Sequence, residues 1–208
     1  MKKIMDKLFN TIKFDKRYVF FCLVIVLLGI LTGSFFIIVL NNSDKSLVIE
    51  YIESFIGSIK NNNFNYIDTF KNTLIINYLF IFLISIIGIT QFLCPLNILL
   101  LFYKSFIVGF SLSSFILTYK IKGLLLSILY IFPHLIINIL LFSLLIAFTL
   151  KICIKTIKYI IKKKDVNMRL YFSKYLYTVL FVFMIITISS LYESFIAPYL
   201  LKFIVNMI

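Results

Sequence analysis

Three ionisable residues, Lys104, His134 and Glu193, fall inside long apolar runs of this sequence. Such groups are costly to bury in a bilayer, so each calls for a functional hypothesis. His134 follows Pro133, and Asn138 comes four residues later, which places the imidazole and the amide on one helix face. Two interpretations stay open. One is a neutral histidine satisfied by Asn138 or by a carbonyl that the proline frees, and the other is transport of a proton or solute.

Lys104 and Glu193 also have two interpretations. At 1.5 Å per residue we expect Lys104 about 12 Å from the cytoplasmic end of its helix and Glu193 about 27 Å along the last one. A direct pair would therefore need an offset between helices. Both residues can equally be interfacial, with Lys104 snorkelling to the inner interface and Glu193 near the outer one.

The sequence lacks the residue patterns that membrane enzymes use for catalysis. A zinc-protease motif needs two histidines, and His134 is the only one. The aspartates lie outside the apolar runs, and no phosphate-binding glycine loop or serine nucleophile motif occurs. Cys22, Cys94 and Cys153 are far apart and are expected to be unpaired packing residues. We expect no enzyme activity, no metal and no cofactor.

The elements that must position these residues are transmembrane helices. Hydrophobic residues make up 62% of the 208 positions and charged residues 14%, which predicts an all-α, polytopic membrane bundle formed by one domain over 1–208. The break at Cys94-Pro95 is interpreted as a tight hairpin. Windows of about 20 residues predict five spans, near 18–40, 74–94, 96–119, 124–150 and 176–197.

Basic residues orient these spans. They gather before the first span and in the loop 151–174, which predicts that both segments are cytoplasmic and contact an anionic inner leaflet. The loop 41–73 and the carboxyl end then lie outside. Because the basic groups flank spans, we expect no nucleic-acid binding. The two groups consist of Lys2, Lys3, Lys7, Lys13, Lys16, Arg17, and of Lys151, Lys155, Lys158, Lys162, Lys163, Lys164, Arg169, Lys174.

The loop 41–73 contains a second kind of helix. Apolar residues recur at helical spacing with acidic and basic residues between them, which predicts an amphipathic helix on the outer surface. It either covers the bundle or docks extracytoplasmic partners, and the pattern leaves both open. Its apolar positions are Val48, Ile49, Ile52, Phe55, Ile56 and Ile59.

Small residues predict close helix packing at two places. Gly29 and Gly33 form a GxxxG pair in the first span, and Ser105, Gly109 and Ser113 form a ridge in the third. Either ridge could pack inside the bundle or form the interface of a homo-oligomer.

Several motifs together give the chain a family likeness. It has a basic amino terminus, five spans and an outer loop of roughly 30 residues. It also has Pro133-His134 in the fourth span and two longer runs, Phe102-Tyr103-Lys104-Ser105 leading to Gly109-Phe110, and Ser189-Ser190-Leu191-Tyr192-Glu193-Ser194-Phe195-Ile196-Ala197-Pro198. In these features it resembles the stage II sporulation protein M family, membrane components of the engulfment machinery of endospore-forming bacteria.

The chain also departs from that family. Where the family often has Pro-His-Gly-x-x-Glu, Leu135 replaces the glycine and Asn138 the glutamate. Lys104 is followed by Ser105 where the family usually has glycine, an exchange that preserves close packing.

The resemblance implies a non-catalytic scaffold in the mother-cell membrane. It would recruit the peptidoglycan hydrolases stage II sporulation proteins D and P, a lytic transglycosylase and an amidase/endopeptidase. Our candidate contact residues are Ile52, Phe55, Ile56 and Ile59 in the outer loop, together with Glu193 and Pro198. The alternative is a small transporter or permease subunit, with Lys104, His134 and Asn138 lining a polar path between the third and fourth helices.

Overall fold

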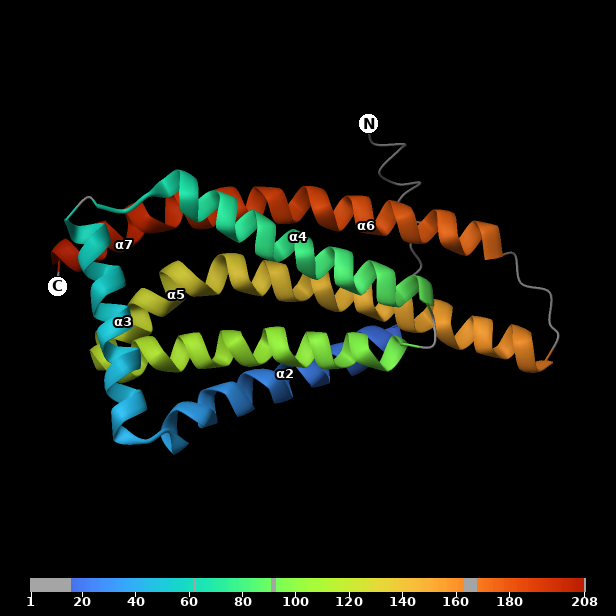
Figure 1. Ribbon diagram of the computed structural model, residues 1–208, viewed down its shortest axis with the longest axis horizontal. Coiled ribbons are helices and arrows are strands. Elements are labelled where there is room, and N and C mark those ends of the chain that lie inside the picture. Colours follow the sequence, from blue (N-terminus) through green and yellow to red (C-terminus); the bar gives the residue numbers. More distant parts are fainter. Residues whose placement is uncertain (1–15, 62, 91–92, 163–167, 208) are drawn as a thin grey trace.

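Helices form every regular element in the computed structural model, which describes residues 16–61, 63–90, 93–162 and 168–207 (Figure 1). Most basic residues before the first span, together with Lys163 and Lys164, lie outside the described residues. Five segments are long and apolar enough to cross a membrane, which confirms the predicted number of spans. Many of their apolar side chains are exposed, such as Phe20, Leu31 and Met184, as a surface in contact with lipid requires.

Two reversals of the chain divide the long helices. α2 (Lys16–Val39) is the first span, α4 (Tyr66–Thr90) the second, and α5 (Cys94–Lys162) contains the third and fourth. The chain reverses between α4 and α5, as expected, and Pro95 lies in the first turn of α5, where its missing N–H breaks no helical bond.

The second reversal lies inside α5 at Lys120, whose φ of 53° and ψ of −126° are not helical. We call residues 94–119 the first arm of α5 and 124–162 the second arm. A side chain on Gly123 would overlap the Phe115 carbonyl, so this tight turn requires glycine.

The fifth span is longer than predicted. α6 (Met168–Leu191) passes without a break into a π-helical turn, η1 (Tyr192–Ile196), and then into α7 (Ala197–Met207). α4 likewise begins eight residues before the predicted position, where the Asn65 Oδ1 accepts a hydrogen bond of 3.3 Å from the Asp68 N–H and caps the helix. Hydropathy misses the start of α4 because polar residues form its first two turns, whereas α7 extends the fifth span with mainly apolar residues.

The two ends of the bundle differ (Figure 1). One end holds the reversal at Lys120, α7, and α3 (Asn42–Lys60), which lies across the ends of the spans. The other end holds the start of α2, the link between α4 and α5, and the end of α5. We call them the α3 end and the α2 end. The second arm of α5 continues to Lys162, as the alternation of basic and apolar residues after Lys151 suggests.

Two apolar clusters hold this arrangement. The larger lies between the spans, where Leu101, Phe142, Leu145, Ile146 and Ile186 are 0–1% exposed. The smaller cluster attaches the α3 helix to the rest of the bundle. In it, three α3 isoleucines pack on the bundle and on α7, and its fully buried members are Ile52, Ile56, Ile59, Phe115, Leu126 and Leu201.

Candidate functional site

Lys104 points into the bundle from the first arm of α5. It is 8% exposed, and its Nζ lies 3.4 Å from the Oδ1 of Asn77 on α4. The same Nζ lies 4.8 Å from the centre of the Phe80 ring and 5.9 Å from that of Phe142, which adds two cation–π contacts. The interpretation of Lys104 as a residue that snorkels to an interface therefore does not hold.

Asn77 connects this lysine to the last span. Its Nδ2 donates to the Ser190 Oγ at 3.4 Å. One turn earlier on the same face of α4, the Thr73 Oγ1 donates to the Glu193 Oε1, also at 3.4 Å. α4 thus presents two polar side chains to the last span, and neither Thr73 nor Asn77 stood out in the sequence because each is an ordinary polar residue beside an apolar run.

His134 approaches the last span from the second arm of α5. Its Nε2 lies 3.7 Å from the Glu193 Oε1, and the two side chains are 3% and 18% exposed. Since Pro133 has no N–H, the Leu129 carbonyl lacks its helical donor, and the Tyr192 hydroxyl donates to it at 3.5 Å instead. The proline therefore helps to attach the fourth span to η1.

Asn138 does not satisfy the histidine. Neither Asn138 Nδ2 nor Oδ1 has a hydrogen-bond partner among the described residues, and the same holds for Ser194 Oγ. Asn138 is 1% exposed, so water does not solvate it from the surface. The interpretation of a histidine satisfied by Asn138 is therefore wrong. We call the whole group the polar cluster, which consists of Thr73, Asn77, Lys104, His134, Asn138, Ser190, Glu193 and Ser194.

An apolar layer closes the polar cluster toward the α2 end. On each of its helices the next turns in that direction carry fully buried apolar residues: Ile81, Ile84, Leu101, Leu145, Ile146 and Ile186. Beyond this layer lies a second polar group, in which the Asn97 Nδ2 donates to the Thr149 Oγ1 at 3.3 Å and the Tyr175 hydroxyl to the Ser85 carbonyl at 3.3 Å. The two polar groups are therefore separated along the bundle.

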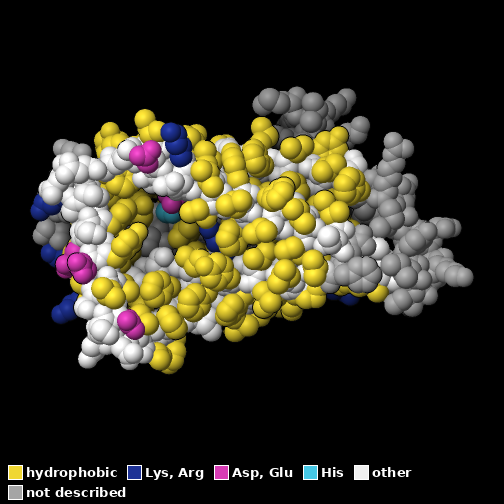
Figure 2. Space-filling model, viewed as in Figure 1, with side chains coloured by type: hydrophobic (Ala, Val, Ile, Leu, Met, Phe, Trp, Pro, Cys, Tyr) yellow, Lys and Arg dark blue, Asp and Glu magenta, His cyan; other side chains and the backbone are white. Residues whose placement is uncertain are grey.

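The surface is hollowed near the polar cluster. Figure 2 shows a recess where the apolar flank of the bundle meets its polar and charged end, and a histidine side chain is visible inside it beside an acidic one. The chain contains one histidine, so this is His134, and its acidic neighbour agrees with the contact to Glu193. The polar cluster thus faces a recess that opens on the flank.

The two small-residue ridges lie against each other within one chain. A Cβ on Gly29 would come within 2.6 Å of the Ser105 Cβ, and one on Gly33 would overlap the Phe106 carbonyl. A Cβ on Gly109 would likewise overlap the Ile30 carbonyl of α2. Ser113 is half-buried on the same arm. The ridges bring α2 onto α5, which leaves neither of them as the surface for a homo-oligomer.

The residues expected to dock partners mostly face inward. Ile52, Ile56 and Ile59 are buried, and the Phe55 ring lies between those of Phe64 and Tyr130, with ring centres 6.0 and 5.5 Å away. Pro198 is also buried and Glu193 belongs to the polar cluster. The face of α3 that points away from the bundle instead carries Glu50, Tyr51, Glu53 and Ser54, all exposed.

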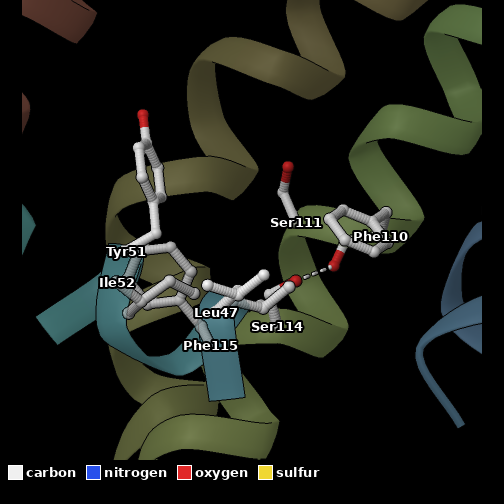
Figure 3. A pocket seen from close by; sticks show the side chains of 8 residues that line it. Leu47, Tyr51, Ile52, Phe110, Ser111, Ser114 and Phe115 are labelled. Atoms are coloured by element: carbon white, nitrogen blue, oxygen red, sulfur yellow. Dashed lines mark hydrogen bonds between the residues drawn. The ribbon is translucent and has the colours of Figure 1, made fainter. Parts of the chain in front are cut away.

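A pocket of about 290 Å³ lies between α3 and the first arm of α5 (Figure 3). Tyr51 and Leu47 of α3 flank this pocket, and these two residues are 75% and 63% exposed. Two serines give it a polar edge, and the hydroxyl of Ser114 donates to the Phe110 carbonyl at 2.8 Å. Its lining is otherwise apolar, so it suits an apolar side chain.

Metal-binding groups are not gathered in the part of the chain that the structure describes, where no three His, Cys, Asp or Glu residues lie close enough to hold an ion.

Comparison with known proteins identifies the family. A family model described as "Stage II sporulation protein M" matches residues 20–198, a range that includes most or all of each of the five spans and the whole of α3 and the polar cluster. The chain belongs to the stage II sporulation protein M family. This family membership and the five apolar helices describe a sporulation-related, multi-pass membrane protein. No curated protein and no solved structure matches the chain.

Proposed function

We propose that this protein is a non-catalytic scaffold in the mother-cell membrane. It recruits the peptidoglycan hydrolases stage II sporulation proteins D and P and organises them for septal wall thinning and membrane migration during engulfment. Family membership supports this role. The observation that carries it is α3, a surface helix anchored to the bundle by three buried isoleucines while its opposite face stays exposed.

The hydrolases act on the wall, so the scaffold must present α3 outside the cytoplasm. The basic residues support that orientation, because 14 of the 21 Lys and Arg residues precede residue 18 or lie in the segment 151–174. Those among them that the structure describes, such as Lys16, Lys151 and Lys174, lie toward the α2 end. Anionic lipid of the inner leaflet attracts such residues. The α2 end is then cytoplasmic and the α3 end extracytoplasmic.

A platform without catalytic groups works by holding two enzymes near each other. Two weak contacts on one platform give a much tighter assembly than either contact alone. We place one contact on the exposed face of α3 and in the neighbouring pocket, where Tyr51 and Leu47 frame room for an apolar anchor side chain.

Co-purification from sporulating cells tests this proposal. The detergent-solubilised wild-type protein is expected to retain both hydrolases, and Tyr51→Ala together with Glu53→Lys to lose at least one of them. Tyr177→Ala is the matched control, because Tyr177 is similarly exposed but lies toward the α2 end. His134→Leu is expected to change retention little. Failure of the wild-type protein to retain either hydrolase contradicts the scaffold.

A transporter is the second candidate, favoured by the ionisable residues of the polar cluster. The apolar layer around Leu145 and Ile146 counts against it, because this layer interrupts any polar path between the two ends. Solute flux into liposomes that contain the purified protein, without binding of the hydrolases, would favour the transporter.

A further inference from the structure

Two opposite charges belong to the polar cluster without touching each other. The Lys104 Nζ lies against Asn77 and the Phe80 ring, whereas the Glu193 Oε1 lies near Thr73 and His134. Within the described part of the chain, no direct ion pair joins the Lys104 ammonium and the Glu193 carboxylate. Charges that are held apart in a medium of low polarity attract complementary groups strongly.

Unpartnered polar atoms lie beside these charges. Both polar atoms of the Asn138 amide lack a partner among the described residues, although the side chain is 1% exposed. Ser194 Oγ is in the same position. Since buried polar atoms are nearly always hydrogen-bonded, this set indicates a bound group that has both donors and acceptors.

The location indicates how such a group enters. The recess in which the histidine is visible lies at the border between the apolar flank and the polar end of the molecule, the level at which lipid headgroups lie (Figure 2). Toward the α2 end the apolar layer with Leu101 and Ile146 closes it. The cluster therefore has the form of a closed site, entered from the flank, and differs from a channel.

We propose that this recess binds a zwitterionic group, with the ammonium of the ligand at Glu193, its anionic end at Lys104, and its remaining polar atoms at the Asn138 amide. Two sources have this chemistry: the phosphoethanolamine headgroup of a membrane lipid, and a free zwitterion such as an amino acid. An amphiphile would place its headgroup in the recess and its acyl chains along the apolar flank. This binding does not depend on the recruitment of hydrolases.

The test is a titration of the full-length, delipidated protein in detergent, with binding read by native mass spectrometry and by the midpoint of thermal unfolding. The probes are phosphatidylethanolamine, phosphatidylglycerol, soluble phosphoethanolamine and glycine. A lipid source predicts saturable binding of phosphatidylethanolamine at least about ten-fold tighter than that of phosphatidylglycerol. A free source predicts binding of phosphoethanolamine or glycine and none of the lipid. Equal binding of the two lipids overturns the proposal, because phosphatidylglycerol has no ammonium, and so does binding of no probe.

Matched variants locate the site. Glu193→Gln, Lys104→Met and Asn138→Leu are each expected to weaken binding about ten-fold or more, since each removes a charged or polar contact. Glu50→Gln and Lys71→Met, which change exposed residues that do not belong to the polar cluster, are expected to bind as the wild type does. Unchanged binding in all three recess variants overturns the proposal. The lipid preference of the wild type remains decisive if a variant fails to fold.

Discussion

The imidazole of His134 and the carboxylate of Glu193 approach within 3.7 Å, although one lies in the fourth span and the other in the fifth. Two irregularities accompany this contact. Pro133 removes a helical donor just before the histidine, and Glu193 lies in the π-helical turn η1. Such turns are rare and occur frequently at functional sites. The family match covers both irregularities, so they belong to the part of the chain that carries the family's pattern.

Charge compensation inside the bundle gives the first prediction. Lys104→Met leaves the buried Asn77 Oδ1 without its donor and Glu193 without the attraction of a cation that it does not touch, and we expect the free energy of unfolding to fall by about 1–3 kcal/mol. Adding Glu193→Gln removes the uncompensated charge and should restore part of that loss. Unfolding in mixed micelles measures both changes, with Lys71→Met as the exposed control. Strictly additive effects would show that the two charges do not act on each other.

The contact between α2 and α5 gives the second prediction. In Gly33→Ala the new methyl group overlaps the Phe106 carbonyl, and in Gly109→Ala it overlaps that of Ile30. Backbone cannot move aside as a side chain does, so each variant should lose about 1–3 kcal/mol of stability. Thermal unfolding in detergent measures the loss, and crosslinking between α2 and the first arm of α5 reports their separation.

Gly57→Ala is the matched control for these substitutions. Gly57 lies in the α3 helix, and a Cβ there has no neighbour within 4 Å. Because alanine favours a helix over glycine, this variant should be equally stable or more stable by up to about 1 kcal/mol. A destabilised Gly57→Ala would mean that helix packing does not explain the glycine effects.

Much of the fold is predictable from the sequence because hydropathy reports directly on the bilayer. The spans, the hairpin near Pro95 and the amphipathic α3 all follow from local patterns. The helix ends are less predictable. α4 starts at Tyr66 because the cap at Asn65 stabilises a polar first turn that hydropathy cannot detect.

The site is predictable only in part. Lys104, His134, Asn138 and Glu193 stand out as polar residues in apolar runs, but their convergence depends on the offsets between four helices. Asn77 gave no signal because its role appears only when α4 lies beside Lys104. The same limit applies to α3, where periodicity identifies the face with Ile52 and Ile56 but not the surface that covers it.

The anchoring of α3 gives the third prediction. Ile56 is 6% exposed in the apolar cluster with Phe115, Leu126 and Leu201, so Ile56→Asp places an unpaired charge there. We expect α3 to detach, with faster amide hydrogen exchange over residues 42–60 and loss of the hydrolases from the purified complex. Leu47→Asp is the control for the hydrogen-exchange measurement only, because Leu47 is 63% exposed and tolerates a charge but also lines the pocket proposed to bind a hydrolase. Protection of α3 in Ile56→Asp would show that the cluster does not hold it.

The orientation of the bundle gives the fourth prediction. Two exposed serines mark its ends, Ser54 on α3 and Ser173 near the start of α6. The native Cys22, Cys94 and Cys153 are buried and do not need to be replaced in these variants, since buried thiols react slowly. A membrane-impermeant maleimide should label Ser54→Cys in intact protoplasts and Ser173→Cys only after permeabilisation. The reverse labelling would place the basic α2 end outside the cytoplasm, where neither anionic inner-leaflet lipid nor the positive-inside rule accounts for its lysines. The α3 helix would then lie on the cytoplasmic side of the membrane, where it cannot meet a wall hydrolase.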